Sequence, residues 1–272
     1  MLELLDHDSS YFVTLTYDDM HLPVHEYCNV ETGEVGCSAS LDKDDFQRFM
    51  KRLRKAHIKK YGEEAKLRYF CAGEYGSSTH RPHYHAIIFG LQLDDLKFYK
   101  RNSYPENYDL YSSEWLSRIW KNGYAVVGKV NWDTCAYTAR YIVKKVYGNA
   151  SEVYEKYNFE PEFTLMSRRP GIARSYFDEN KESIKDCMCR HDTIPVSDGS
   201  RVRPARTPKY FERIFELEEP ELMEDLKETR RRIAEDLTEA KLSQTDLEYL
   251  DMLKVEESVF EASVSALRRK EI

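Results

Sequence analysis

The sequence predicts an α+β fold, an antiparallel sheet with flanking helices, followed by a C-terminal helical extension. Three observations support this prediction. Short segments rich in β-branched and aromatic residues recur through the first half of the chain, as strands require. Between them, apolar residues recur at helical spacing, and residues 221–271 are strong helix formers with charges at i,i+4. The order β, α, β, β, α, β, α suggests a topology related to ferredoxin-like folds.

The first half of the chain alternates strands with one long helix. Tyr11–Tyr17 is predicted to be a strand because β-branched and aromatic residues dominate it. Apolar residues from Leu41 to about Tyr61 recur at helical spacing, and Ser40 is the expected N-cap of that helix. Leu67–Gly73 and His83–Phe89 are two further strands, joined by a hairpin loop that contains Gly, Ser and Pro.

The second half predicts further elements and two extensions. A helix over 112–120 and a strand over Tyr124–Val130 precede a helix from Thr134 to Tyr147 that Gly148 ends. Prolines then predict an irregular segment, and they stand at Pro170, Pro195, Pro204 and Pro208. The expected division is a folded domain over 1–150, an irregular basic extension over 151–215 and a charged helical tail over 216–272. One or two exposed helices are expected in that tail.

Composition places the chain among proteins of the cell interior. Its 272 residues can bury one substantial core. No apolar run reaches the roughly 18 residues of a membrane span, and the start lacks the basic residues of a secretory signal. The six cysteines have no C-x-x-C spacing and are expected to be reduced thiols. A cytoplasmic location without membrane contact is therefore the expectation.

Charge is distributed unevenly along the chain. The net charge is −7, but residues 41–150 hold 20 basic and 12 acidic side chains. Residues 1–40 hold eight acids and no Lys or Arg, and residues 216–272 hold 17 acids against nine basic residues. Because phosphate contacts depend on positive potential within a Debye length of about 10 Å, the basic middle remains compatible with DNA. Modest, salt-sensitive binding is expected.

Two histidines and a carboxylate are candidate metal ligands. His83 and His85 stand two apart on a predicted strand, so their side chains project from one face. If the preceding strand pairs antiparallel with theirs, Glu74 lies beside them and completes a triad with open positions for Mg²⁺ or Mn²⁺. The alternatives remain open that the histidines are packing residues and that Glu74 pairs with Arg81 or Arg68.

A third group is carried by the helix predicted over 134–147. Tyr137, Tyr141, Lys144 and Lys145 fall on one side of that helix, and the apolar residues, Cys135 among them, fall on the other. The tyrosines and lysines are therefore expected to face a cleft, although two tyrosines on a solvated face are an alternative.

Together these groups suit transfer of a phosphodiester to a phenol. A tyrosine of ordinary pKa, about 10, is a weak nucleophile near neutral pH. A divalent cation would make the phosphate more electrophilic, and Lys144 could lower the phenol pKa or stabilise phosphotyrosine. The expected product is a 5′-phosphotyrosine link with a free 3′-OH.

At these residues the sequence resembles the HUH replication initiators, especially those of microviruses of the gokushovirus-like group. Residues 12–17 are similar to the family's first motif, 81–90 to the HUH motif, and 137–145 to the two-tyrosine motif. The resemblance covers about 11–148 and implies a ferredoxin/RRM-like HUH endonuclease domain that starts rolling-circle replication. It implies that Tyr137 and Tyr141 alternate as nucleophiles and that His83, His85 and Glu74 hold the metal.

The resemblance also implies partners and a setting. Expected partners are single-stranded DNA and a replication origin, in the cytoplasm of a bacterial host. A host helicase is expected because the chain has no Walker motif, and a host DNA polymerase is expected to extend the 3′-OH. Expected strand contacts are Thr14, Thr16, Tyr17, His80, Arg81 and Lys145. Two other functions stay open: a transposase or relaxase of the same superfamily, and a non-catalytic protein that binds origin DNA.

Overall fold

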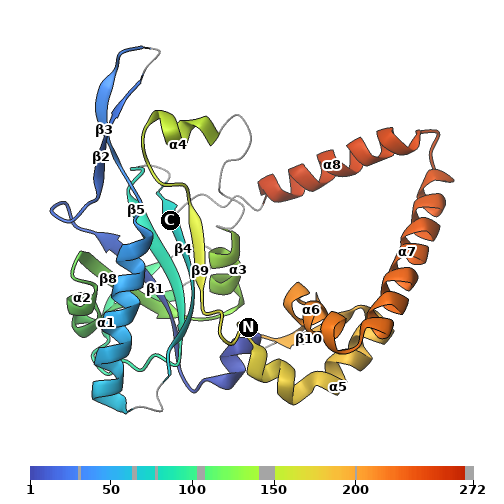
Figure 1. The fold of residues 1–272 in the computed structure, drawn as a ribbon, viewed down its shortest axis with the longest axis horizontal. Coiled ribbons are helices and arrows are strands. Elements are labelled where there is room, and N and C mark those ends of the chain that lie inside the picture. Colours follow the sequence, from blue (N-terminus) through green and yellow to red (C-terminus); the bar gives the residue numbers. More distant parts are fainter. Residues whose placement is uncertain are drawn as a thin grey trace. The chain divides into compact units, whose positions relative to one another are not determined.

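The computed structural model describes residues 1–29, 32–62, 66–76, 79–102, 108–140, 151–199 and 201–266. Its centre is a seven-stranded sheet in the order β6-β7-β8-β1-β5-β4-β9 (Figure 1). All the recorded strand pairs of this sheet are antiparallel. The strands are β1 (Ser10–Tyr17), β4 (Arg68–Tyr75), β5 (Pro82–Phe89), β6 (Lys97–Asn102), β7 (Tyr108–Ser112), β8 (Gly123–Lys129) and β9 (Phe163–Met166). The predicted α+β class with an antiparallel sheet is confirmed.

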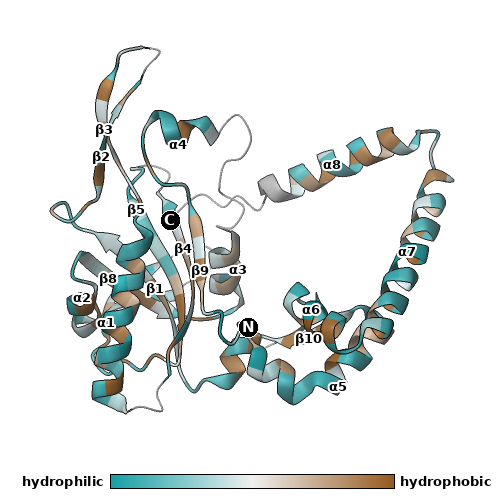
Figure 2. Ribbon diagram, in the orientation of Figure 1, coloured by the Kyte–Doolittle hydropathy of each residue, from teal (hydrophilic) through white to brown (hydrophobic). Residues whose placement is uncertain are grey.

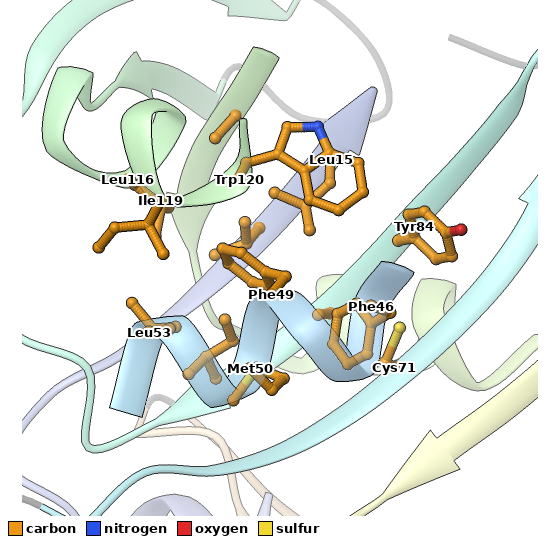
Figure 3. Close-up of a cluster of buried hydrophobic side chains, with 14 of the residues drawn as sticks. Leu15, Phe46, Phe49, Met50, Leu53, Cys71, Tyr84, Leu116, Ile119 and Trp120 are labelled. Atoms are coloured by element: carbon orange, nitrogen blue, oxygen red, sulfur yellow. The ribbon is translucent and has the colours of Figure 1, made fainter. Parts of the chain in front are cut away.

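Helices α1 (Lys43–Tyr61) and α2 (Glu114–Trp120) cover one face of this sheet and enclose the main core. Figure 3 shows Phe49 of α1 next to Trp120 of α2, and Phe46 of α1 near Tyr84 of β5. Alternate residues of β1 and β5, Leu15 and Tyr84 among them, point into this core and are fully buried. Full burial of a large side chain stabilises the fold by about 1.5–3 kcal/mol, so this face anchors the sheet.

The opposite face of the sheet carries a smaller cluster under helix α3 (Trp132–Arg140). Phe12, Ile87 and Phe89 are buried there, and Tyr137 of α3 packs against them. Because successive residues of a strand point to opposite faces, this face also receives Thr14, Thr16 and the side chains of His83 and His85. The predicted helix from Thr134 to Tyr147 begins as α3, and residues 141–150 lie outside the described residues.

The start of α1 differs from the sequence prediction. Its N-cap is Asp42, whose side chain accepts hydrogen bonds from the backbone N–H groups of Asp44 and Asp45. The prediction of Ser40 is wrong because that residue is fully buried and its hydroxyl donates to the Leu41 carbonyl. A carboxylate at the cap also interacts favourably with the helix dipole.

Two hairpins that the sequence analysis did not predict lengthen the fold. Strands β2 (Val24–Cys28) and β3 (Val35–Ala39) form a separate two-stranded sheet between β1 and α1. Strands β6 and β7 extend the central sheet beyond β8. The six cysteines are free thiols, as predicted.

Residues 151–215 are not irregular, so that part of the prediction is wrong. The segment holds α4 (Glu152–Lys156), β9, α5 (Arg174–His191), β10 (Thr193–Ser197), β11 (Val202–Arg206) and α6 (Lys209–Glu218). Its prolines are accommodated because Pro195 and Pro204 lie in the two-stranded β10-β11 sheet and Pro208 directly precedes α6. Edge strands and helix starts tolerate the missing N–H. Strand β9 pairs with β4, so the central sheet extends past residue 150.

The chain divides into two compact units. One comprises Met1–Asn180 and Pro195–Arg203, and the other comprises Lys181–Ile194 and Pro204–Ile272. In the second unit, α7 (Pro220–Leu242) and α8 (Tyr249–Ala266) follow α6, which confirms the predicted helical tail. Figure 2 shows hydrophilic and apolar residues interspersed along both helices. None of the described helices has the length and apolarity needed to cross a membrane.

Candidate catalytic site

Strand pairing brings the predicted metal ligands together. Glu74 on β4 is the Cα partner of His83 on β5, and His83 is also the partner of Thr16 on β1. The ring centroids of His83 and His85 are 6.4 Å apart. The predictions that the two histidines share one face and that Glu74 lies beside them are therefore confirmed.

The ring of His85 is held from both nitrogens. Its Nε2 lies 2.7 Å from Oε1 of Glu74, and its Nδ1 lies 3.1 Å from Oγ1 of Thr14. Glu74 is 4% exposed and His85 is 7% exposed, so the pair is shielded from water. A buried ring with two partners keeps one orientation, as a metal-ligating histidine requires.

The alternative pairing of Glu74 with an arginine is wrong. Arg68 instead forms an ion pair with Glu3, and Arg81 pairs with Asp19 at 2.8 Å. The Glu74 carboxylate thus faces the histidines and not the nearby guanidinium groups.

His83 presents a different environment from His85. Its Nδ1 is buried and has no hydrogen-bond partner among the described residues. Burial, assisted by the nearby His85, lowers the pKa of His83, so its ring is neutral near pH 7. The neutral ring is the form that binds a metal ion.

These residues fit a divalent cation chemically, although they do not yet form a complete cage. Across the described ranges, no three His, Cys, Asp or Glu side chains stand in a ready-made metal-binding arrangement. The ligand atoms available are nevertheless those of two imidazoles and one carboxylate, and the buried Nδ1 of His83, which has no hydrogen-bond partner among the described residues, is an atom that a cation can bind. Glu74, His83 and His85 are thus the side chains that could hold Mg²⁺ or Mn²⁺.

Helix α3 brings a phenol to this face. The ring of Tyr137 lies 5.3 Å from the ring of His85 between centroids, in an edge-on arrangement, and 6.0 Å from that of Phe12. The side chain is half-buried. The other residues expected from this helix, Tyr141, Lys144 and Lys145, lie outside the described residues.

One detail of the predicted helix faces is wrong. Cys135 was expected on the apolar side, away from Tyr137, but both pack against the cluster of Phe12, Ile87 and Phe89. Two residues apart on a helix are about 200° apart, so the pair flanks the line of contact from its two sides. The side chain of Tyr137 therefore packs against the sheet, where a cleft was expected.

The residues expected to contact the DNA strand lie in four different settings. Tyr17 is wrong as a base-stacking residue, because it is 1% exposed and its hydroxyl donates to Asp45 on the α1 side of the sheet. Arg81 donates two hydrogen bonds to the Tyr17 carbonyl, so it cross-links the end of β1. Thr14 and Thr16 lie on the histidine face, and His80 lies exposed in the loop before β5.

The sequence analysis did not identify two features of this site. Thr14 was expected to contact DNA, but its hydroxyl orients His85. Tyr124, on β8, is the Cα partner of Thr16 and is 66% exposed on the histidine face. Neither feature has a local sequence signal, because both depend on which residues face one another across the sheet.

The chain is similar to known replication-associated proteins. Residues 10–146 match the model of a family of replication-associated proteins of the ORF2 type. The chain is 31% identical over 262 residues to the replication-associated protein ORF2 of Spiroplasma virus 4, which covers 96% of this chain and 75% of that protein.

Two further relatives are matched over smaller parts of their length. The replication-associated protein VP4 of Bdellovibrio phage phiMH2K is 29% identical, over 79% of this chain and 60% of its own. The replication-associated protein ORF4 of Chlamydia phage 1 is 31% identical, over 53% of this chain and 33% of its own. No solved structure matches the chain significantly.

Proposed function

The chain belongs to the family of ORF2-type replication-associated proteins, and from this premise we propose that it nicks and rejoins single-stranded DNA during rolling-circle replication of a phage. The observation that carries the proposal is the position of Tyr137. Its ring lies beside His85, which in turn contacts Glu74 and Thr14. A nucleophile is thus adjacent to the side chains that would hold a cation.

The proposed reaction is a transfer of the phosphoryl group. The phenol oxygen of Tyr137 attacks the scissile phosphorus and loses its proton, the bond to the 3′ oxygen breaks, and that oxygen gains a proton. The products are a 5′-phosphotyrosine link and a 3′-OH that can prime synthesis. Attack by a 3′-OH on the same phosphorus reverses the step and rejoins the strand.

The side chains of the sheet have separate tasks in this reaction. Glu74, His83 and His85 would hold Mg²⁺ or Mn²⁺, which neutralises charge on the scissile phosphate when bound. Thr14 fixes the orientation of His85. Phe12 supports the ring of Tyr137 from below, at 6.0 Å between centroids. We assign the second nucleophile to Tyr141 and the stabilisation of its phosphate to Lys144 and Lys145.

The proposed setting follows from the family. The protein acts on the replication origin of the phage, in the cytoplasm of the infected bacterial cell. A host helicase unwinds the duplex, since the chain carries no Walker motif, and a host polymerase extends the 3′-OH.

A covalent adduct is the direct test. The protein is incubated with labelled circular single-stranded DNA and Mn²⁺, and a denaturant-resistant adduct is sought. The adduct is expected to disappear in EDTA, and to disappear when Tyr137 and Tyr141 are both changed to Phe. Tyr249→Phe, which removes an exposed hydroxyl on α8, should leave it unchanged. An adduct that survives the double change would exclude these nucleophiles.

The same experiment distinguishes the competing functions. One observation favours a non-catalytic origin-binding protein: His85 is already satisfied by Glu74 and Thr14, as a packing histidine would be. Such a protein would bind origin DNA without any adduct. A transposase or relaxase would form the adduct but would require a different DNA substrate.

A further inference from the structure

The sheet face that carries the histidines continues past β1 to the edge strand β6. His85 pairs with Thr14, Thr14 with Val126, Val126 with Ser112, and Ser112 with Lys97. Residues directly opposite each other in antiparallel strands project from the same face. Four strand spacings of about 4.8 Å make this row about 19 Å long. Lys97 and His85 therefore lie on one surface.

An exposed aromatic ring lies part of the way along this surface. Tyr124 pairs with Thr16, and Thr16 pairs with His83, so two strand spacings separate Tyr124 from a proposed metal ligand. Its side chain is 66% exposed and belongs to neither hydrophobic cluster. An exposed ring beside a phosphate-processing site is suited to stacking on a base.

Positive charge lies at the far end of the same surface. Lys97 and Lys100 of β6 pair with Ser112 and Leu110 of β7, and both lysines are exposed. Leu110 lies on the same face as the histidines. A Cβ built on Gly128, the partner of Leu110, would contact the Leu110 side chain and also the ring of Phe12, which belongs to that face. Neither lysine forms an ion pair within the described part of the chain.

The carboxylates near these lysines are already paired. Asp109 accepts from Arg101 at 2.6 Å, and Glu114 forms its ion pair with Arg118 and interacts with Lys97 only over a longer range. Asp95 accepts from the hydroxyl of Ser113 at 2.7 Å and from the backbone N–H of Trp115. The positive charge of Lys97 and Lys100 is therefore available to a polyanion.

We propose that Tyr124, Lys97 and Lys100 form a strand-guiding surface. It binds one flank of the single-stranded DNA whose scissile phosphate lies at the histidines. A base stacks on Tyr124, and the two lysines contact backbone phosphates. This inference rests on the proposed action on single-stranded DNA. The occupant is a single strand and not a duplex, because a duplex keeps its bases stacked on one another and out of reach of Tyr124.

The binding experiment uses the full chain, EDTA, and fluorescent oligothymidylates of increasing length. Tyr124→Ala is expected to weaken binding of the longer oligonucleotides by about 5- to 150-fold, the usual effect of one lost stacking contact. Tyr124→Phe keeps the ring and should bind like the unchanged protein.

The lysines are tested by salt dependence. Changing Lys97 and Lys100 to Ala should lower the slope of log affinity against log salt by about 1.4, since each phosphate contact on a single strand contributes about 0.7. Lys129→Ala is the matched control, because Lys129 pairs with Tyr11 and is exposed on the opposite face of the same sheet. It should leave the slope unchanged.

Several results would overturn the strand-guiding surface. These are equal weakening by Tyr124→Phe and Tyr124→Ala, an unchanged salt slope in the lysine variant, or a larger loss of binding to duplex than to single strand. Thermal unfolding shows whether each variant is folded. If Tyr124→Ala does not fold, the salt dependence of the lysine variant tests the surface instead. Binding is measured in EDTA, where no nicking occurs, so this test is independent of the adduct test. A protein that forms no adduct can still bind DNA through this surface, and a protein that forms the adduct can still fail to bind DNA there.

Discussion

The two faces of strands β1 and β5 are made of alternate residues of the same segments, yet they use their polar groups in opposite ways. On the α1 side, the hydroxyls of Tyr17 and Tyr84 lie 2.7 Å apart, and Tyr84 donates to the carbonyl of Asp42. On the other side, Nδ1 of His83 has no partner among the described residues. On the α1 side the tyrosine hydroxyls form hydrogen bonds within the protein. On the other side a ring nitrogen remains that can bind a metal ion.

This difference separates stability from function. Burial raises the pKa of Tyr17 and of Tyr84, so both remain protonated and continue to tie α1 to the sheet. On the histidine face, burial lowers the pKa of His83 and keeps it neutral. Substitutions on the α1 side should therefore affect unfolding, and those on the histidine side should affect metal binding and adduct formation.

The largest effect is expected from His85→Ala. It removes a proposed metal ligand and deprives the buried Glu74 of its histidine partner. The yield of adduct with circular single-stranded DNA should fall to background. Urea denaturation should show that the variant still unfolds cooperatively and is therefore folded in the adduct assay. A variant that retains full adduct would place the cation, or the chemistry, elsewhere.

The next largest effect is expected from Thr14→Val, which keeps the shape of the side chain and removes the hydroxyl that holds Nδ1 of His85. Loss of such a supporting bond typically weakens metal affinity by about 10- to 100-fold. Titration with Mn²⁺ measures it. Thr164→Val, a similar change on β9, is the control and should bind Mn²⁺ normally. Equal affinities in both variants would contradict a positioning role for Thr14.

Tyr84→Phe tests the α1 side. The substitution removes the hydroxyl that joins Tyr17 to the backbone of Asp42, and it leaves buried groups without a partner. The expected cost is about 1–3 kcal/mol in the free energy of unfolding. Adduct yield per folded molecule should not change. Urea denaturation measures the first quantity, and loss of adduct without loss of stability would break the proposed separation of the two faces.

The smallest effect is expected from acid titration of Glu3, a second buried carboxylate. Burial raises the pKa of Glu3, but bonds from His7, the Ala173 N–H and Arg68 outweigh it and hold the pKa below its ordinary value. Its stabilisation is therefore present above the ordinary glutamate pKa of about 4.3 and is lost as the pH falls through the lowered value. The free energy of unfolding of the Glu3→Gln variant, measured by urea denaturation, should therefore depend less on pH in that acid range than that of the unchanged protein.

Glu3 and Glu74 are both buried carboxylates, but they have different partners. Glu3 is held by a guanidinium and a backbone N–H, as a structural group is, whereas Glu74 contacts His85. If Glu3→Gln changed adduct yield as strongly as His85→Ala, burial alone would not distinguish structural from functional acids in this protein.

Strands and their faces could be predicted where the sequence repeats every second residue. The run from His83 to Phe89 has the composition of a buried strand, and residues two apart on a strand project from the same face, so the shared face of His83 and His85 followed from strand geometry alone. The hairpins β2-β3 and β6-β7 were missed because their strands are short and largely exposed, without a clear apolar alternation. The N-cap was placed at Ser40, whereas the structure caps the helix with Asp42, because the Asp42 carboxylate accepts from the backbone N–H groups and Ser40 is buried.

The sequence by itself determined the α+β class and the helical tail, and it supplied the candidate histidines, carboxylate and tyrosines, because residue type and local periodicity are encoded within a few neighbours. Only the tertiary structure decided that Glu74 contacts His85 and not an arginine, that Tyr17 is buried, and that Tyr124 and Lys97 lie on the histidine face. Those relations depend on strand register. Register joins residues as far apart in the chain as Thr14 and Val126, and packing of the whole sheet selects it.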